Sequence, residues 1–275
     1  MKNFLLFLVF CIFLNGCSKN KEIETSIINK DLIEEQMIKS YQEGIKAYNS
    51  QSYLEAAKKF NEAEILFPQS EWAPKSSLMA AYSYFSDSYN NDAILELQNF
   101  FKKYPNDPKI SYAHYLLAMS YYNNIIDEKK DLEPLEKSKI QFEYIVKNYP
   151  ETDFAFDSKF KLDLINEMIA SKEMYIARYY IDKKKWIPAI NRLKFIIEKY
   201  DNTIFVEEAL HRLVEIYYKI GLREESKKYA VVLGHNYPES RWYKNSYKIY
   251  NKNYKPVIQK KNKKSTLEKF KSLLD

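Results

Sequence analysis

Residues 41–68 of the chain read YQEGIKAYNSQSYLEAAKKFNEAEILFP, and this stretch decides the fold. It ends in an aromatic residue followed by Pro68. Proline ends a helix because it lacks an amide donor and biases the residue before it away from helical geometry. Counting back from Pro68, the apolar or small residues Ala56, Phe60 and Ala63 recur at helical spacing. They predict a helix that buries one face and stops before the proline.

The same landmark, an aromatic residue, a proline and then a polar residue, recurs along the chain. It occurs as FPQS from Phe67, YPND from Tyr104, YPET from Tyr149 and YPES from Tyr237, with the variant YDNT from Tyr200. Ser, Thr or Asp after the proline is suited to cap the next helix. The three positions before each later landmark are also apolar or small: Ala93, Leu97 and Phe100; Ser138, Phe142 and Ile145; Ala189, Leu193 and Ile196; Ser226, Ala230 and Leu233.

The first helix of each unit, which precedes the helix described above, also has a recurring pattern. One position on it is shared by all five units, at intervals of 37, 37, 59 and 37 residues: Gly44, Ala81, Ala118, Ala177 and Val214. Three residues later come Ala47, Tyr84, Tyr121, Tyr180 and Tyr217. A small residue and a tyrosine three apart lie on one helix face, where the small residue lets the next helix approach closely.

This pattern resembles the tetratricopeptide repeat, although the unit exceeds the usual length of about 34 residues. We predict an all-α fold, a right-handed superhelix of about five tetratricopeptide-like helix pairs. The alternative is an irregular helical bundle with accidental periodicity. The three glycines after residue 16 and the lack of β-hairpin turn pairs agree with the all-α class.

The predicted organisation has six parts. In chain order they are a signal peptide over 1–16, a flexible tether over 17–30, an N-terminal lobe of three repeats over 31–150, a connecting helix over 151–171, a C-terminal lobe of two repeats over 172–250, and a basic tail over 251–275. A longer loop between Tyr122 and Ser138 breaks the register of the third unit. The tail has six lysines and no acid over 252–264, followed by a short amphipathic stretch that either docks or is solvated.

The N-terminus predicts export and lipidation. Lys2 precedes an apolar run over residues 4–14, and such a run of helix, at about 1.5 Å per residue, is too short to cross about 30 Å of hydrocarbon. The run ends in Leu-Asn-Gly-Cys17, which resembles the bacterial lipobox and implies cleavage before Cys17 and acylation of that cysteine. Ser18, rather than aspartate, favours the outer membrane. The alternative is an ordinary secreted protein in which Cys17 is incidental.

The remaining composition excludes several classes of chemistry. Cys11 leaves with the signal, so the mature chain has no second cysteine for a disulfide or a cysteine metal site. His114, His211 and His235 have no metal-ligand partner at the usual spacing, and neither a nucleophile elbow nor a phosphate loop is present. The net charge of +6 is modest, and an exported chain is not expected to bind nucleic acid. We predict no enzyme activity, no metal and no cofactor apart from the covalent lipid on Cys17.

Stacked helix pairs bind other chains along the surface lined by the first helix of each unit. In the tetratricopeptide pattern, the groove-facing positions of the first three units would be Tyr41, Ile45 and Tyr48; Leu78, Tyr82 and Phe85; and Tyr115, Met119 and Tyr122. Six of these nine are aromatic, which suits an extended peptide. The alternative is that they pack against the second helix of a neighbouring unit.

The lipobox, the repeats and the landmarks, in this order, resemble the BamD family of outer-membrane assembly lipoproteins. The resemblance is closest at Arg178-Tyr-Tyr, Trp186, Ala189, Asn191-Arg192-Leu193 and Tyr200-Asp-Asn-Thr, and it extends to the first unit from Tyr41 to Pro68. Asp201 in place of proline, the long loop and the lysine-rich tail depart from the family pattern.

The resemblance implies a lipid-anchored scaffold on the periplasmic face of the outer membrane, within the β-barrel assembly machinery. Its N-terminal repeats would bind unfolded outer-membrane proteins. Its C-terminal repeats would dock on a BamA-like barrel subunit near Arg178 and Arg192, beside other assembly-machine lipoproteins. Alternatively, the two arginines form ion pairs within the repeats. The alternative function is a periplasmic repeat lipoprotein that organises the cell envelope or peptidoglycan without a role in barrel assembly.

Overall fold

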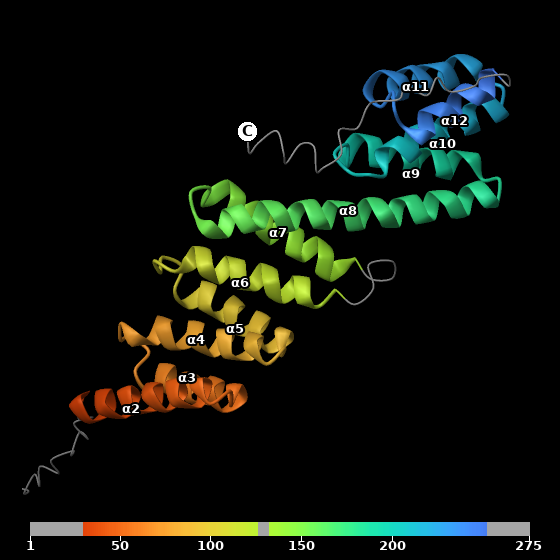
Figure 1. Cartoon of the computed structure of the whole chain (residues 1–275). Helices are drawn as coiled ribbons and strands as arrows, with labels where there is room; N and C mark the ends of the chain where they lie inside the picture. The colour runs from red at the N-terminus through yellow and green to blue at the C-terminus, as the bar shows by residue number, and fades with distance from the viewer. Residues whose placement is uncertain (1–29, 126–131, 252–275) are drawn as a thin grey trace, which may run out of the picture. The chain divides into compact units, whose positions relative to one another are not determined.

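The computed structural model describes residues 30–125 and 132–251, which form eleven α-helices and no strand (Figure 1). In chain order these are α2 (Lys30–Asn49), α3 (Tyr53–Leu66), α4 (Trp72–Ser86), α5 (Asn90–Lys103), α6 (Ile110–Asn123), α7 (Glu133–Asn148), α8 (Asp153–Asp182), α9 (Trp186–Lys199), α10 (Val206–Lys219), α11 (Arg223–Asn236) and α12 (Arg241–Tyr250). The predicted all-α class is confirmed. None of the described helices is both long and apolar enough to span a membrane.

The buried positions of the repeats match the prediction closely. At the three positions before each landmark, every residue is buried except Ala230, which is half-buried. The small residues from Gly44 to Val214 are also all buried. Each helix pair therefore packs through the stripe that the sequence pattern marks.

Each landmark lies where one helix ends and the next begins, and at two of the five the predicted residue is the N-cap and accepts a side-chain hydrogen bond. Thr152 accepts a hydrogen bond from the Ala155 amide at 3.2 Å, and Ser240 accepts one from the Trp242 amide at 3.0 Å. These hydroxyls satisfy amides that have no partner in the first turn of α8 and α12. In the variant without proline, the Thr203 hydroxyl instead donates to the Tyr200 carbonyl at 2.8 Å.

The chain divides after Asp87 into two compact units. In the first unit, α3 packs against both α2 and α4. Its core holds Phe60, whose ring lies 5.3 Å from that of Tyr41. A Cβ atom added to Gly44 would lie 2.8 Å from Phe60 Cδ1, so the close approach of α2 and α3 depends on glycine at this position.

In the second unit, each helix from α5 to α11 packs against the next, and α12 packs against α10 and α11. The helix α8 has 30 residues, whereas α9 and α10 have 14 each. It is continuous across the predicted connecting helix and the first helix of the fourth repeat, and this extra length, together with the longer loop after Tyr122, explains the 59-residue interval. The assignment of repeats to lobes over 31–150 and 172–250 stays a prediction.

Several predicted features lie outside the described residues. These are the signal peptide, Cys17 and the tether up to residue 29, residues 126–131 of the long loop, and the lysine-rich tail from residue 252.

Candidate functional site

The first unit carries an apolar hollow on α2, which we call the α2 hollow. It has a volume of about 440 Å³ and is lined by Ile38, Tyr41, Gln42, Ile45, Lys46, Asn49 and Trp72. Two predicted groove residues, Tyr41 and Ile45, are therefore part of it. The Tyr41 ring lies 5.0 Å from the Trp72 ring, which makes one wall of the hollow aromatic. Lys46 is the one cationic side chain among the lining residues.

The other predicted groove residues of this unit have packing partners. The Tyr48 ring is stacked on the Tyr82 ring at 5.5 Å, and the Tyr48 hydroxyl lies 3.2 Å from Ser86 Oγ. Phe85 is half-buried, whereas Leu78 is buried with 5% of its surface exposed. Tyr41, Ile45 and Tyr48 all pack against the Phe60 core, but only Tyr41 and Ile45 also line the α2 hollow.

In the second unit, Tyr115, Met119 and Tyr122 pack against the core of their own unit. The Tyr115 hydroxyl donates to Asp157 Oδ2 at 2.7 Å, and its ring lies 5.2 Å from Phe154. Burial, together with this carboxylate, raises the pKa of Tyr115 well above its usual range. These three partly buried side chains join α6 to α7 and α8, and their assignment to a peptide groove stays a prediction.

A larger hollow, which we call the α7–α9 trough, lies over α8 between α7 and α9. Its volume is about 750 Å³. The residues that line it are Leu132, Glu136, Lys139, Ile140, Glu143, Ile169, Glu173, Tyr180, Pro188, Asn191, Arg192, Phe195 and Tyr200. Ile140 leaves 60% of its surface exposed, so an apolar side chain is open to a partner at the rim. Lys139 Nζ lies 5.1 Å from the ring centre of Tyr200 at one end.

Arg192, a predicted docking residue, lines this trough and forms an ion pair within it. Its Nη1 donates to both carboxylate oxygens of Glu173, at 3.0 and 2.9 Å. The Glu173 side chain is only 6% exposed, whereas that of Arg192 is 44% exposed. The pair joins α8 to α9 and leaves much of the guanidinium open to a partner.

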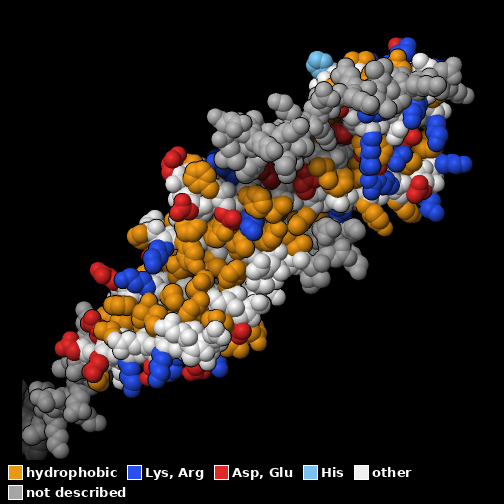
Figure 2. Space-filling view, in the orientation of Figure 1, with side chains coloured by type: hydrophobic (Ala, Val, Ile, Leu, Met, Phe, Trp, Pro, Cys, Tyr) orange, Lys and Arg blue, Asp and Glu red, His pale blue; other side chains and the backbone are white. Residues whose placement is uncertain are grey.

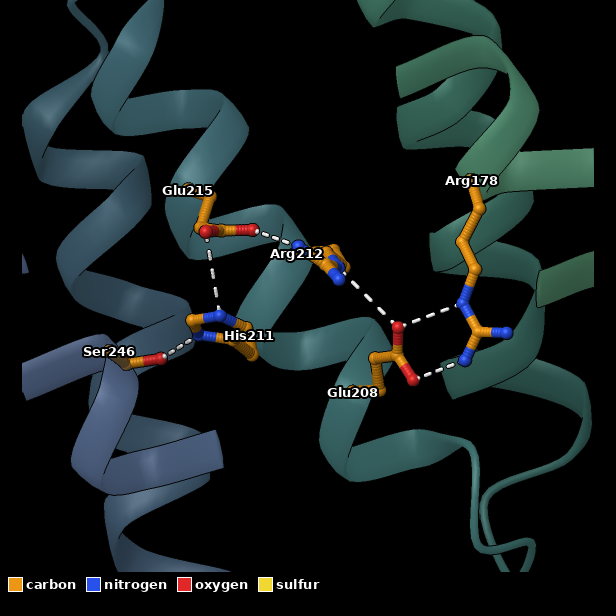
Figure 3. A network of polar contacts seen from close by, with 6 residues as sticks. All are labelled: Arg178, Glu208, His211, Arg212, Glu215 and Ser246. Carbon is orange, nitrogen blue, oxygen red and sulfur yellow. Dashed lines mark hydrogen bonds and ion pairs between the residues drawn. The ribbon is translucent and has the colours of Figure 1, made fainter. Parts of the chain in front are cut away.

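The second predicted docking residue, Arg178, is part of a polar network between α8, α10 and α12 (Figure 3). Its Nε and Nη2 donate to the two oxygens of Glu208 at 2.9 and 2.5 Å. Arg212 extends the network from Glu208 to Glu215, whose Oε2 lies 2.7 Å from Arg212 Nη1. Burial opposes the ionisation of Glu208, but the hydrogen bonds and charges of the two arginines outweigh it and hold the pKa of Glu208 below its usual value.

The network ends at His211, which is buried on α10. Its Nδ1 lies 2.8 Å from Ser246 Oγ on α12, and its Nε2 lies 3.6 Å from Glu215 Oε1. Burial lowers the pKa of His211, and the Glu215 carboxylate opposes this in part. His211 therefore serves as a neutral link between α10 and α12 at neutral pH.

The other two histidines lie in separate surroundings. The His114 ring is stacked on Phe101 at 4.3 Å, and its Nδ1 lies 3.0 Å from Gln141 Oε1. His235 is exposed near the end of α11. Across residues 30–125 and 132–251, no three His, Cys, Asp or Glu side chains converge to hold a metal ion.

Sequence reasoning missed three residues that shape these surfaces. Trp72 stands at the first position of α4, whereas the groove pattern covers only later positions of each first helix. Glu173 and Glu208 look like ordinary helix-surface acids in the sequence, yet both are buried beneath an arginine. Only their position on the apolar face, beside Ala177 and Ala209, could have indicated this.

Comparison with known proteins gives a consistent result. The family model described as "YfiO: Outer membrane lipoprotein" matches residues 33–233. The chain is similar to "Outer membrane protein assembly factor BamD" of Rickettsia prowazekii, with 39% identity over 90% of this chain and 95% of the relative. It is also similar to the protein of that name from Caulobacter vibrioides, with 36% identity over 80% of this chain and 72% of the relative. Among solved structures, "TPR2AB-domain:pHSP90-complex of yeast Sti1" has a TM-score of 0.40 and 15% identity, and covers 74% of this chain and 78% of that one.

Proposed function

Because the chain belongs to the YfiO/BamD family of outer-membrane lipoproteins, we propose that it is an outer-membrane protein assembly factor that binds unfolded barrel proteins and passes them to a barrel subunit. The observation that supports this most directly is the family match, which covers ten of the eleven described helices completely or in large part. The protein does no bond chemistry in this role. It holds other chains, and tethering raises their effective concentration at the membrane.

We assign substrate binding to the α2 hollow. A barrel strand has apolar residues at every second position and aromatic residues near both membrane interfaces. The α2 hollow offers Ile38, Ile45 and the Tyr41–Trp72 wall to such side chains, while Lys46 is placed to meet a carboxylate. One or two apolar side chains of an extended segment would fill it, and contacts with the Tyr41 and Trp72 rings would orient them.

Site-specific photocrosslinking tests this assignment. A photoreactive residue in place of Gln42, which is exposed and lines the α2 hollow, should crosslink to peptides from unfolded barrel proteins. The same residue in place of Lys58, exposed on α3 outside the hollow, is the control. Crosslinks of equal yield from both positions, or from neither, would contradict substrate binding at this surface.

A pair of matched variants measures how much the apolar side chains of the α2 hollow contribute to peptide binding. Ile38→Ser with Ile45→Ser should weaken peptide binding about tenfold or more, because burying each such side chain contributes about 1.5–3 kcal/mol when complete. Ile65→Ser, on a side chain that is 75% exposed on α3, should change it less than twofold. Equal losses in both variants would contradict a site at the α2 hollow. Because Ile45 also packs against the Phe60 core, the double variant must keep the circular dichroism and urea midpoint of the wild type for its loss to count.

We assign partner docking to the α7–α9 trough, and we propose Arg178, which lies outside the trough and pairs with Glu208 on α10, as a separate contact. Exposed Ile140 and Phe195 provide apolar contact, and the guanidinium groups of Arg192 and Arg178 are positioned over buried carboxylates. A BamA-like barrel subunit with an acidic, apolar periplasmic surface would suit this face. Recovery of that subunit from membranes by wild type, and its loss with Ile140→Asp, would support the assignment. Recovery of cell-division or peptidoglycan proteins instead would favour the envelope-organising alternative.

The lipid on Cys17 completes the proposal. Lipobox cleavage and acylation would anchor the chain at the periplasmic face of the outer membrane, since two or more acyl chains give stable residence. Mass spectrometry of the mature protein should show an acylated N-terminal Cys17. An unmodified residue 17 in a chain released from membranes by high salt would contradict the anchor and leave substrate binding to be judged separately.

A further inference from the structure

The helix α8 carries a stripe of residues that changes from exposed to buried along its length. Successive members are four and three residues apart, which keeps them on one side of the helix. The last members are Ala170, Met174 and Ala177, all 0% exposed. The first members, Phe156 and Phe160, are 63% and 60% exposed. One face of α8 is therefore covered in the C-terminal half of the helix and open in the N-terminal half.

This difference arises from the lengths of the helices. Because α8 has 30 residues and α9 has 14, α9 covers only part of α8. Figure 1 shows the N-terminal end of α8 extending well past α9. The open part of the stripe, from Phe156 to Glu167, is about 16 Å long at about 1.5 Å per residue, which is about three helical turns. In Figure 2, hydrophobic and acidic side chains lie next to each other over this end of α8.

A polar pocket lies where the open stripe ends. Its volume is about 490 Å³, and it is lined by Asp163, Asn166, Glu167, Lys199, Tyr200, Asp201, Asn202 and Thr203. Three acids and one lysine give this lining a formal charge of −2. Glu167 Oε1 accepts a hydrogen bond from the Ile204 amide at 3.1 Å, and Ile204 leaves 77% of its surface exposed. Apolar side chains, Phe160 one turn before Asp163 and Ile204 beside Glu167, therefore flank an acidic pocket.

Two oxygen atoms of the pocket residues are buried without a hydrogen-bond donor from the described parts of the chain. They are Asn166 Oδ1 and Glu167 Oε2. Buried acceptors in folded proteins are nearly always paired, because an unpaired one is costly. A lysine ammonium has three N–H donors and an arginine guanidinium has five, and neither accepts. A cationic side chain that enters the pocket can therefore donate to these oxygens and balance the negative charge.

We propose that the open stripe of α8 docks an amphipathic helix of a partner protein, whose apolar side chains cover Phe156 and Phe160 and whose lysine or arginine enters the polar pocket. Spacings of four and three residues are those by which two helices pack side by side. This site goes beyond the functions proposed above. It shares no residue with the α2 hollow, and only Tyr200 lines both the polar pocket and the α7–α9 trough.

The charge and spacing of this surface favour a basic helix over other occupants. A lining with a net charge of −2 repels phosphate groups and anionic lipid headgroups. A barrel strand carries apolar residues at every second position, which does not match spacings of four and three. A metal ion is not favoured, because no three His, Cys, Asp or Glu side chains of the described chain converge.

Site-specific photocrosslinking in whole cells identifies the occupant. A photoreactive residue replaces Phe160, and in the control it replaces Val231, which is 69% exposed on α11. Peptides crosslinked at position 160 and read by mass spectrometry should come from one partner segment. That segment should have apolar residues at helical spacing and a lysine or arginine nearby. Position 231 should not capture it.

The variant Asp163→Lys tests the polar half of the site. Asp163 is exposed, so the substitution leaves the core intact. Because the new ammonium group repels the cation of the partner and meets the pocket itself, crosslinking from position 160 should fall about tenfold. Asp182→Lys, at an exposed acid that ends α8, is the matched control and should keep the wild-type yield. Circular dichroism should show the same helix content in both variants.

A synthetic peptide of the captured segment then measures the contribution of its cation. The protein is residues 17–275 with Cys17→Ser. The peptide is compared with a neutral twin in which citrulline replaces arginine, or norleucine replaces lysine. Hydrogen bonds from a charged donor are the stronger ones, so the twin should bind wild type about tenfold more weakly. The peptide and its twin should bind Asp163→Lys equally.

Four outcomes would overturn the proposal. The first is a lack of protein crosslinks at position 160, or capture of the same segment at position 231. The second is crosslinking only to lipid, to a second copy of this chain or to many unrelated barrel strands. The third is an unchanged yield in Asp163→Lys, and the fourth is equal binding of the peptide and its neutral twin to wild type. Because these results do not involve the α2 hollow, they leave substrate binding there to be judged separately.

Discussion

The contact between Gly44 and Phe60 gives a sharp test of how the repeat packs. Alanine is the better helix former by about 1 kcal/mol, so Gly44→Ala in an open helix would stabilise α2. Here the added Cβ atom would lie 2.8 Å from both Cδ1 and Cε1 of Phe60 and 3.1 Å from Cζ. The Phe60 ring is 0% exposed, which leaves it little room to move away.

Overpacking of this kind costs about 1–3 kcal/mol, which exceeds the gain in helix propensity. We therefore expect Gly44→Ala to destabilise the first unit by about 1 kcal/mol. Hydrogen exchange measured by mass spectrometry should show amides of α2 and α3 opening about fivefold more often. Peptides from α10 and α11, in the other unit, serve as the internal control and should not change.

A second substitution separates the clash from other effects. In a Phe60→Leu background the ring is gone, so Gly44→Ala should become neutral or stabilising. The coupling between the two sites should be about 1–2 kcal/mol. Gly44→Ala that stabilises the chain with Phe60 present, or additive effects in the double variant, would refute the close-packing explanation.

Three further predictions concern the second unit. Phe142→Ala should cost about 3–5 kcal/mol of unfolding free energy, because the ring is 0% exposed, and a loss below 1 kcal/mol by urea unfolding would contradict its place in the core. Glu208→Gln removes the charge and one acceptor oxygen, so it should weaken the contact with the Arg178 guanidinium and raise the exchange of amides in α10. Unchanged exchange would contradict a stabilising role for this ion pair. Because burial lowers the pKa of His211 in the folded chain, neutral His211 stabilises the folded state fully above about pH 6.5, and this contribution is lost as the pH falls. The urea midpoint of His211→Gln, followed by circular dichroism, should therefore change less between pH 7.5 and pH 5.5 than that of the wild type. An equal change in both proteins would contradict this.

Much of the fold could be predicted because the repeat is a local pattern. Prolines after an aromatic residue end helices wherever they occur, and small residues at fixed intervals mark close helix contacts. Those signals depend only on neighbours in sequence. They located the buried stripe of every second helix, with only Ala230 less buried than expected. The continuity of α8 was also readable, because residues 153–182 contain neither proline nor glycine.

The surfaces were harder to predict because they depend on contacts between segments far apart in sequence. Tyr115 looked like a groove residue, but it meets Asp157, 42 positions later. Arg178 and Arg192 looked exposed, and they are, but each lies over a glutamate whose burial no local pattern indicates. The hollow around Trp72 arises only when α4 places that ring beside α2.

We propose that this chain supports assembly of outer-membrane barrels by holding their unfolded segments. Its most direct test is the amount of folded barrel protein in outer membranes after depletion of the chain, with variants supplied to restore it. Wild type and Ile65→Ser should restore barrel levels, whereas Ile38→Ser with Ile45→Ser should not. Barrel levels that stay normal throughout depletion, while envelope shape or peptidoglycan fails, would contradict the claim.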